Sequence, residues 1–182
     1  EAPAMGGHVV RAAVERAGID PALIDDCIMG AAAQQGTQAY NLGRLSAIAG
    51  GLPESVAGMA IERQCSSGLM AIATAAKSIM CNEYDVAVAG GLESISLVQN
   101  KHKNSYRNVS KTVLGIDPRA YIPMIETAEI VCDRYGISRE AQDEYSLQSQ
   151  QRTAAAQEAG LFDDEIVPMA TTKAVFNKET KE

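Results

Sequence analysis

Tryptophan is absent from this chain of 182 residues, and aromatic residues of all kinds make up only 4% of it. Hydrophobic residues still reach 46%, so we expect a globular core built from alanine, isoleucine, leucine, valine and methionine. No apolar run approaches the ~20 residues that a membrane-spanning helix needs, and no basic segment followed by an apolar stretch marks a signal peptide. The composition therefore predicts a globular protein with no membrane partner.

Clustered basic residues and metal ligands are also scarce. The formal net charge is −7 and no basic stripe dominates, so we expect no nucleic-acid partner. With two histidines, and four cysteines that form no Cys-x-x-Cys pair, we expect no metal site. Cys27 and Cys81 lie in apolar segments that predict buried thiols, and this cysteine pattern suggests a reducing compartment.

Helices and strands are predicted to alternate through the first half of the chain. The expected elements are a helix ending at Gly18, a strand at 27–29, a helix from Asn41 to about Ala49, a strand at 56–61, a helix at 66–81 and a strand at 85–89. The last three form a βαβ unit with parallel strands. The helix at 66–81 is apolar almost all round, which predicts burial on every side, between two sheets or beneath a second domain.

The composition changes after about Ile95. Residues 99–119 are rich in polar and charged side chains and predict a long exposed segment. Helical spacing resumes at 125–135 and at 138–159, where Ser138 is the expected N-cap and Gly160 the expected stop.

Cys65 lies where the predicted strand at 56–61 gives way to the helix at 66–81. The first N–H groups of a helix have no internal partners, and together with the helix dipole they favour a thiolate, which is the reactive form of cysteine. The same groups can hold a developing oxyanion. Ligands of open α/β sheets bind beyond the C-terminal ends of the strands. This geometry alone leaves two interpretations open, a structural cysteine and a nucleophile.

Five segments, in order along the chain, resemble the thiolases, the acetyl-CoA acyltransferases. Ile61–Leu69 resembles the segment around their active-site cysteine, and Ala89–Ser96 resembles a second landmark, with Leu92 where the family usually has methionine. The remaining matches are Gly30 with Gln35-Gly36 and Asn41-x-x-Arg44, Tyr135–Asp143, and Glu165–Pro168.

The resemblance implies a layered α/β/α/β/α fold whose first half is incomplete and carries an inserted loop domain. Residues 1–95 would be the N-terminal α/β domain without its first strand, and 96–182 a truncated loop domain. Cys65 would be the nucleophile that becomes an acyl-thioester, with its backbone N–H directed at the oxyanion. The implied activity is the making or cleaving of 3-ketoacyl-CoA in fatty acid metabolism such as β-oxidation. Acyl-CoA and CoA would be substrates, with no permanently bound cofactor.

Ile122–Glu129 resembles the loop-domain segment that holds CoA in thiolases. It makes Met124 a substrate-binding residue near the pantetheine and the reacting thioester, with core packing as the alternative. Ile125 stands where the family commonly has glycine, and Pro123 where biosynthetic members have histidine, which leaves the acyl chain length open. A basic cluster could meet CoA phosphates or a neighbouring subunit, although a solvated loop is the simpler interpretation. It consists of Lys101, His102, Lys103, Arg107 and Lys111.

The histidine and the second cysteine of the thiolase mechanism lie in a Gly-His-Pro and a Cys-x-Gly segment, and neither pattern occurs in this sequence. We therefore expect this chain alone to be inactive. Two alternatives within the fold are a thiolase-like protein that binds acyl-CoA or lipid without turnover, and a relative of the 3-ketoacyl synthases. A redox-sensing thiol protein is a third, weakened because no resolving cysteine is near Cys65. The resemblance also implies a homodimer or homotetramer. We expect a cytoplasmic protein of bacterial type, with an organellar location as the alternative.

Overall fold

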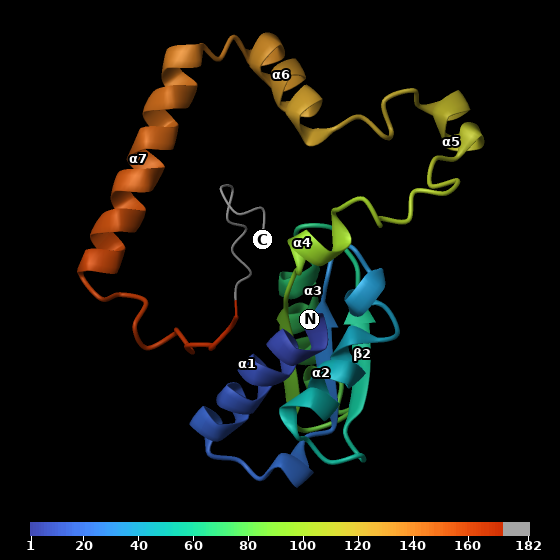
Figure 1. Ribbon diagram of the computed structural model, residues 1–182, viewed down its shortest axis with the longest axis vertical. Coiled ribbons are helices and arrows are strands. Elements are labelled where there is room, and N and C mark those ends of the chain that lie inside the picture. The colour runs from blue at the N-terminus through green and yellow to red at the C-terminus, as the bar shows by residue number, and fades with distance from the viewer. Residues whose placement is uncertain (173–182) are drawn as a thin grey trace, which may run out of the picture. The chain divides into compact units, whose positions relative to one another are not determined.

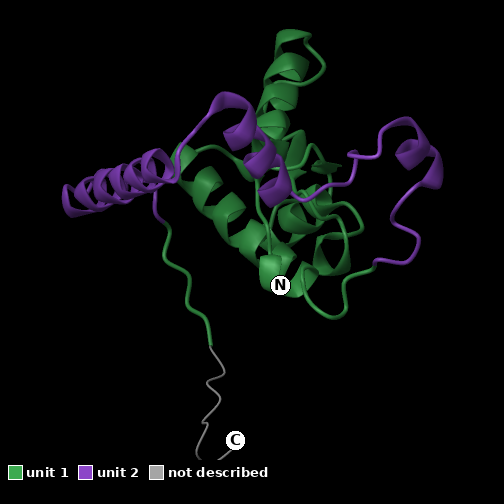
Figure 2. Cartoon of the chain, turned by 90° about the horizontal axis from the view of Figure 1, so that it is seen from above, with its two compact units in different colours: residues 1–104, 167–182 green, residues 105–166 purple. Residues whose placement is uncertain are grey.

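The computed structural model describes residues 1–172. The chain divides into two compact units, Glu1–Asn104 with the segment from Val167 onward, and Ser105–Ile166 (Figure 2). The domain boundary predicted at residue 95 stays a prediction, and residues 173–182 of the predicted loop domain lie outside the described part of the chain.

A three-stranded parallel sheet with strand order β2–β1–β3 lies at the centre of the first unit. The strands are β1 (Asp26–Gly30), β2 (Ala57–Ile61) and β3 (Ala87–Gly91). All three predicted strands are confirmed, with small shifts at their ends. Gly30, Ile61 and Gly91 are paired in register, so they stand level at the C-terminal edge of the sheet. The βαβ spacing predicts that β2 and β3 are parallel, but it does not reveal that β1 lies between them.

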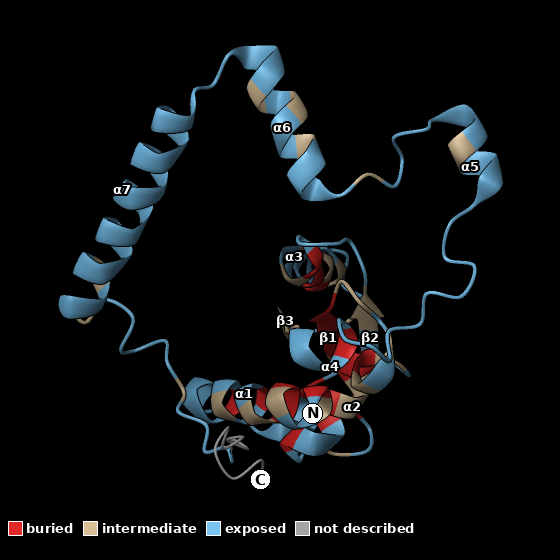
Figure 3. Ribbon diagram, turned by 45° about the horizontal axis from the view of Figure 1, so that its top comes forward, coloured by how far each residue is buried: buried red, intermediate tan, exposed pale blue. Residues whose placement is uncertain are grey.

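Helices cover both faces of this sheet (Figures 1 and 3). The main helices are α1 (Ala2–Ala17), α2 (Leu42–Gly50) and α3 (Ser67–Met80), with short helices at η1 (Pro21–Leu23), η2 (Gly36–Gln38) and α4 (Ile95–Val98). α1 and α2 pack together on one face, and α3 packs on the other. As predicted, Gly18 caps α1 with φ 64, and the Asn41 side chain caps α2 by accepting a hydrogen bond from the Arg44 N–H.

The central strand supplies side chains to two cores, because successive residues of a strand point to opposite faces. Cys27 and Met29 join the core beneath α1 and α2, together with Val10, Val14, Leu42, Ala47 and Val56. Ile28 packs on the opposite face against Ala71 and Ala75 of α3. The result is a three-layer α/β/α arrangement whose middle strand is almost wholly buried.

The prediction that α3 is buried on every side is wrong for this chain. Only Ser67, Ala71 and Ala75 of the helix are buried, whereas Leu69 is 71% exposed and Met80 is 81% exposed. The described residues form a single sheet, and a helix that packs on one sheet keeps its outer face open to solvent.

The second unit consists of helices joined by irregular segments. Its helices are α5 (Lys111–Ile116), α6 (Met124–Tyr135) and α7 (Arg139–Glu158), and none of their residues is buried. Ser138 caps α7 as predicted, since its hydroxyl accepts a hydrogen bond from the Ala141 N–H. Residues 99–119 are exposed as predicted, apart from the half-buried Leu114, and they also contain α5. Within residues 1–172, no helix combines the length and apolar character needed to cross a membrane.

Candidate active site

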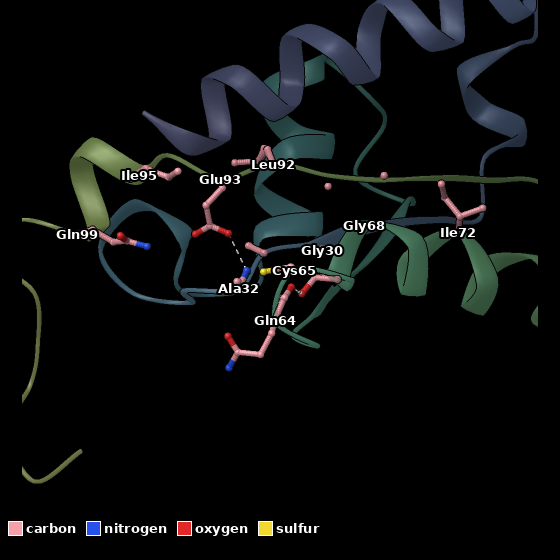
Figure 4. Close-up of a pocket in the computed structure, with 14 residues that line it drawn as sticks. Gly30, Ala32, Gln64, Cys65, Gly68, Ile72, Leu92, Glu93, Ile95 and Gln99 are labelled. Carbon is pink, nitrogen blue, oxygen red and sulfur yellow. Dashed lines mark hydrogen bonds between the residues drawn. The ribbon is translucent and has the colours of Figure 1, made fainter. Parts of the chain in front are cut away.

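A cavity of about 520 Å³ lies at the C-terminal edge of the sheet, beside Cys65. Its walls come from the ends of β1 and β3, the turn before α3, and residues of α3 and α4 (Figure 4). Its lining residues include Gly30, Ala32, Cys65, Gly68, Leu92 and Glu93. This is the edge at which open α/β sheets bind their ligands, so its position suits a substrate pocket.

Cys65 is an exposed, free thiol in the connection between β2 and α3. One residue, the N-cap Ser66, lies between Cys65 and Ser67, the first residue of the 14-residue helix α3. The side chain therefore lies next to the N-terminus of α3, where a negative charge is favoured. Solvent access and this position are what a nucleophilic thiol needs.

The turn that precedes Cys65 is held by short hydrogen bonds. Gln64 adopts φ 51, a left-handed conformation that is uncommon for a residue with a side chain. The Ser67 hydroxyl accepts a hydrogen bond from the Arg63 N–H at 2.8 Å and donates one to the Gln64 carbonyl at 2.6 Å. A carboxylate oxygen of Glu62 accepts from the Gln64 N–H at 2.7 Å. These contacts fix the backbone on both sides of Gln64 and so set the direction of Cys65.

Glycines allow α3 to approach the strand ends closely. A Cβ atom at Gly30 would overlap the backbone of Ser67 and would lie 2.6 Å from the Gly68 nitrogen. A Cβ atom at Gly91 would lie 2.8 Å from the Gly68 Cα atom. Real Cβ atoms do not come this close to backbone, so side chains at these positions would push the start of α3 away from the sheet. The pocket wall beside Cys65 depends on that close packing.

Glu93 contributes the one carboxylate that lines the pocket among the described residues. Its oxygens accept hydrogen bonds from the Ala32 N–H at 2.7 Å and the Ala33 N–H at 3.3 Å. The Gln38 side-chain amide donates a third at 2.6 Å. Figure 4 shows the Glu93 carboxylate pointing at the backbone nitrogen of Ala32, with a dashed line for the hydrogen bond between them.

The other cysteines differ from Cys65 in their surroundings. Cys27 is fully buried as predicted, and burial, with the neighbouring Asp26 charge, raises its pKa to about 11. Burial also raises the pKa of Asp26, an effect that a hydrogen bond from Cys27 reduces and the Asp25 charge increases. The prediction that Cys81 is buried is wrong, because Cys81 is the C-cap of α3 at the exposed end of that helix.

Met124 is the first residue of α6 in the second unit and is 76% exposed. The core-packing alternative therefore does not describe it within this chain, and its substrate-binding role stays a prediction. The five residues of the predicted basic cluster are likewise exposed. Within residues 1–172, no three histidine, cysteine or acidic side chains are grouped so that they could hold a metal ion.

Sequence reasoning missed two residues that organise the site, Ser67 and Glu93. The sequence alone presents Ser67 as a small neighbour of Cys65 and Glu93 as part of a family landmark. A usable signal for Glu93 is its position, since a carboxylate two residues after an apolar strand that ends in a Gly-Gly pair is expected to find hydrogen-bond donors near the sheet edge. No comparable signal marks Ser67, because its role depends on how the turn folds back.

The chain matches the family model described as Thiolase, N-terminal domain, over residues 1–182. It is 39% identical over 175 residues to a beta-ketoadipyl-CoA thiolase of Pseudomonas aeruginosa, covering 88% of this chain and 44% of that protein. It is 38% identical over 177 residues to a 3-ketoacyl-CoA thiolase of Bacillus subtilis, covering 97% and 45%. The crystal structure of the Bacillus anthracis acetyl-CoA acetyltransferase matches with a TM-score of 0.76 and 39% identity, covering 92% of this chain and 44% of that one. The chain thus spans less than half the length of these relatives.

Proposed function

Because this chain belongs to the thiolase family, we propose that it carries the acyl-accepting nucleophile of an acyl-CoA acyltransferase and that Cys65 is that nucleophile. The observation that carries the proposal is an exposed thiol lining a pocket at the C-terminal edge of the sheet, next to the start of α3. The relatives are named as thiolases and an acetyl-CoA acetyltransferase, which supports acyl transfer as the class of reaction.

In the proposed reaction, the Cys65 sulfur attacks the carbonyl carbon of an acyl-CoA or the ketone carbon of a 3-ketoacyl-CoA. The bond to the CoA sulfur breaks in the first case, and the carbon–carbon bond to the acetyl-CoA portion breaks in the second. The leaving group departs with the bonding electrons and takes up a proton. The acyl group stays on Cys65 as a thioester until CoA or acetyl-CoA removes it, so one difficult step becomes two easier ones.

The surroundings of Cys65 suit this chemistry. The adjoining residues Ser66, Ser67 and Gly68 are small, which leaves room for a thioester carbonyl beside the backbone. We propose that the Cys65 N–H holds the oxyanion that develops on the carbonyl oxygen, since backbone donors at the start of a helix are fixed in place before the reaction. Met124 would contact the pantetheine portion of the same substrate.

The chain alone would lack turnover, because neither the Gly-His-Pro nor the Cys-x-Gly segment of the family occurs in its sequence. In the complete protein we propose the making or cleaving of 3-ketoacyl-CoA, as in β-oxidation, by a homodimer or homotetramer. The free cysteines support a reducing compartment, and the bacterial relatives support a cytoplasmic protein of bacterial type.

Mass spectrometry of the complete gene product, incubated with acetyl-CoA and rapidly quenched, tests the proposal. We expect an added acetyl group on the peptide that contains Cys65 and its loss in Cys65→Ala. Cys81→Ala is the matched control, because Cys81 is also an exposed thiol but does not line the pocket. Labelling that persists in Cys65→Ala would overturn the assignment. Acyl-CoA binding without any labelled cysteine would instead identify the binding protein without turnover.

A further inference from the structure

The Glu93 carboxylate accepts hydrogen bonds from three neutral donors. Two are the backbone N–H groups of Ala32 and Ala33, and the third is the side-chain amide of Gln38. Gln38 is itself fully buried, and it also donates to the Ala33 carbonyl at 2.7 Å and accepts from the Ser94 N–H. A buried amide with each of its polar groups bonded fixes the orientation of the carboxylate that it meets.

These bonds join the segment after β1 to the segment after β3. Ala32 and Ala33 follow β1, whereas Glu93 and Ser94 follow β3. The backbone adds one more link between the same two segments, because the Leu92 N–H donates to the Gly30 carbonyl at 3.0 Å. Glu93 therefore links the segments that follow β1 and β3, at the edge of the pocket just beyond the last hydrogen bonds of the sheet.

The segment that Glu93 holds is also tied to the strand that leads to Cys65. The Ala31 N–H donates to the Ile61 carbonyl at 3.0 Å, and Ile61 is the last residue of β2. Gly30, Ala31 and Ala32 line the pocket together with Cys65. Residues 30–33 thus bridge β2 on one side and Glu93 on the other, and their position sets the distance between the two walls.

We propose that Glu93 is a positioning residue for acyl transfer, acting through residues 31–33 to fix the pocket wall that faces the acyl group on Cys65. The proposal rests on Cys65 being the acyl acceptor. A carboxylate suits this place because it accepts at both oxygens, and three donors converge on it. With glutamine at this position, its NH₂ group would face at least one of those donors, so one hydrogen bond would be replaced by a repulsive contact.

The variant Glu93→Gln tests this in the complete gene product, because it keeps the size of the side chain but removes the negative charge and replaces one acceptor oxygen by an NH₂ donor. We expect the rate of Cys65 acetylation at saturating acetyl-CoA to fall ~10- to 100-fold, the loss that a misplaced reactive geometry causes. Alkylation of Cys65 by iodoacetamide should stay within about twofold of wild type, since a small electrophile needs the exposed thiol but not the pocket wall. Glu54→Gln, the same change at an exposed residue between α2 and β2, should alter neither rate.

Gln38→Met provides a second variant in case Glu93→Gln folds poorly, as judged by circular dichroism and thermal unfolding. It removes one donor to Glu93 at similar volume, together with the Gln38 bonds to the Ala33 carbonyl and the Ser94 N–H, and we expect a loss of acetylation with alkylation again retained. If wild type is labelled at Cys65 but acetylation is unchanged in both variants, the proposed function still stands, whereas the positioning role of Glu93 is overturned. Parallel losses of acetylation and alkylation would also overturn it, because they indicate general disruption. Absence of label on Cys65 in wild type would overturn the proposed function instead.

Discussion

The hydroxyl of Ser67, which is 3% exposed, donates a 2.6 Å hydrogen bond to the carbonyl of Gln64, the residue directly before Cys65. The same hydroxyl accepts from the Arg63 N–H, so it closes the turn from both sides. Gln64 occupies the left-handed region at φ 51, where a residue with a side chain is held at a cost of about 1–3 kcal/mol. The Ser67 contacts offset that cost and thereby keep Cys65 at the pocket.

Replacing Ser67 with alanine should destabilise the protein and slow acylation of Cys65. Loss of the hydroxyl removes the partly buried hydrogen bond to the Arg63 N–H, which should cost about 1 kcal/mol, to be measured by urea unfolding. Ser66→Ala is the matched control, because Ser66 donates to the Arg63 carbonyl from an exposed position and should matter less. Equal effects of the two variants on stability and acetylation would contradict the role given to Ser67.

Gly30→Ala should destabilise the protein, and Gly90→Ala should not. A methyl group at Gly30 would collide with the backbone of Ser67 and Gly68, and such overpacking typically costs about 1–3 kcal/mol. At Gly90, one pairing level away on β3, no atom outside its own neighbours lies within 4 Å of the added Cβ. Thermal unfolding and cysteine acetylation of the two variants check this. If both glycines tolerate alanine equally, α3 does not pack as closely on β1 as described.

The buried thiol of Cys27 should make stability fall at alkaline pH. Its pKa is raised from 9.0 to about 11, so between these values the unfolded chain releases a proton that the folded chain keeps. Stability from this group is therefore complete below pH 9 and is lost as pH rises toward 11, by up to about 1.4 kcal/mol per pH unit. Urea unfolding from pH 8 to 11 measures the slope. Cys27→Ala lacks this titration but keeps every other group, so an identical slope in the variant would contradict the prediction.

Met124→Ala should weaken acyl transfer without loss of stability. Met124 is 76% exposed, and substitutions at exposed sites usually change stability by less than about 0.5 kcal/mol. If Met124 contacts the pantetheine, the variant should raise the KM for acyl-CoA severalfold. Ile125→Ala is the control at the next position, which is 78% exposed. A KM that is unchanged in Met124→Ala, or raised equally in both variants, would count against a substrate contact.

Much of the fold followed from local patterns in the sequence. Gly18, Asn41 and Ser138 mark helix ends through backbone capping, which depends only on residues a few positions apart. The three strands were predictable from their apolar runs. The errors at α3 and Cys81 share one cause, since apolar composition indicates which surfaces prefer burial but not whether another element covers them.

The sequence by itself determined the position of Cys65 between a strand and a helix, and the ordered motifs that relate the chain to thiolases. Only the tertiary structure decided that β1 lies between β2 and β3, and that Gly30, Cys65 and Glu93 line one pocket. The physical reason is that capping and strand formation arise from neighbours along the chain. Strand order, the close approach of glycines and the convergence of donors on Glu93 instead depend on residues up to 61 positions apart.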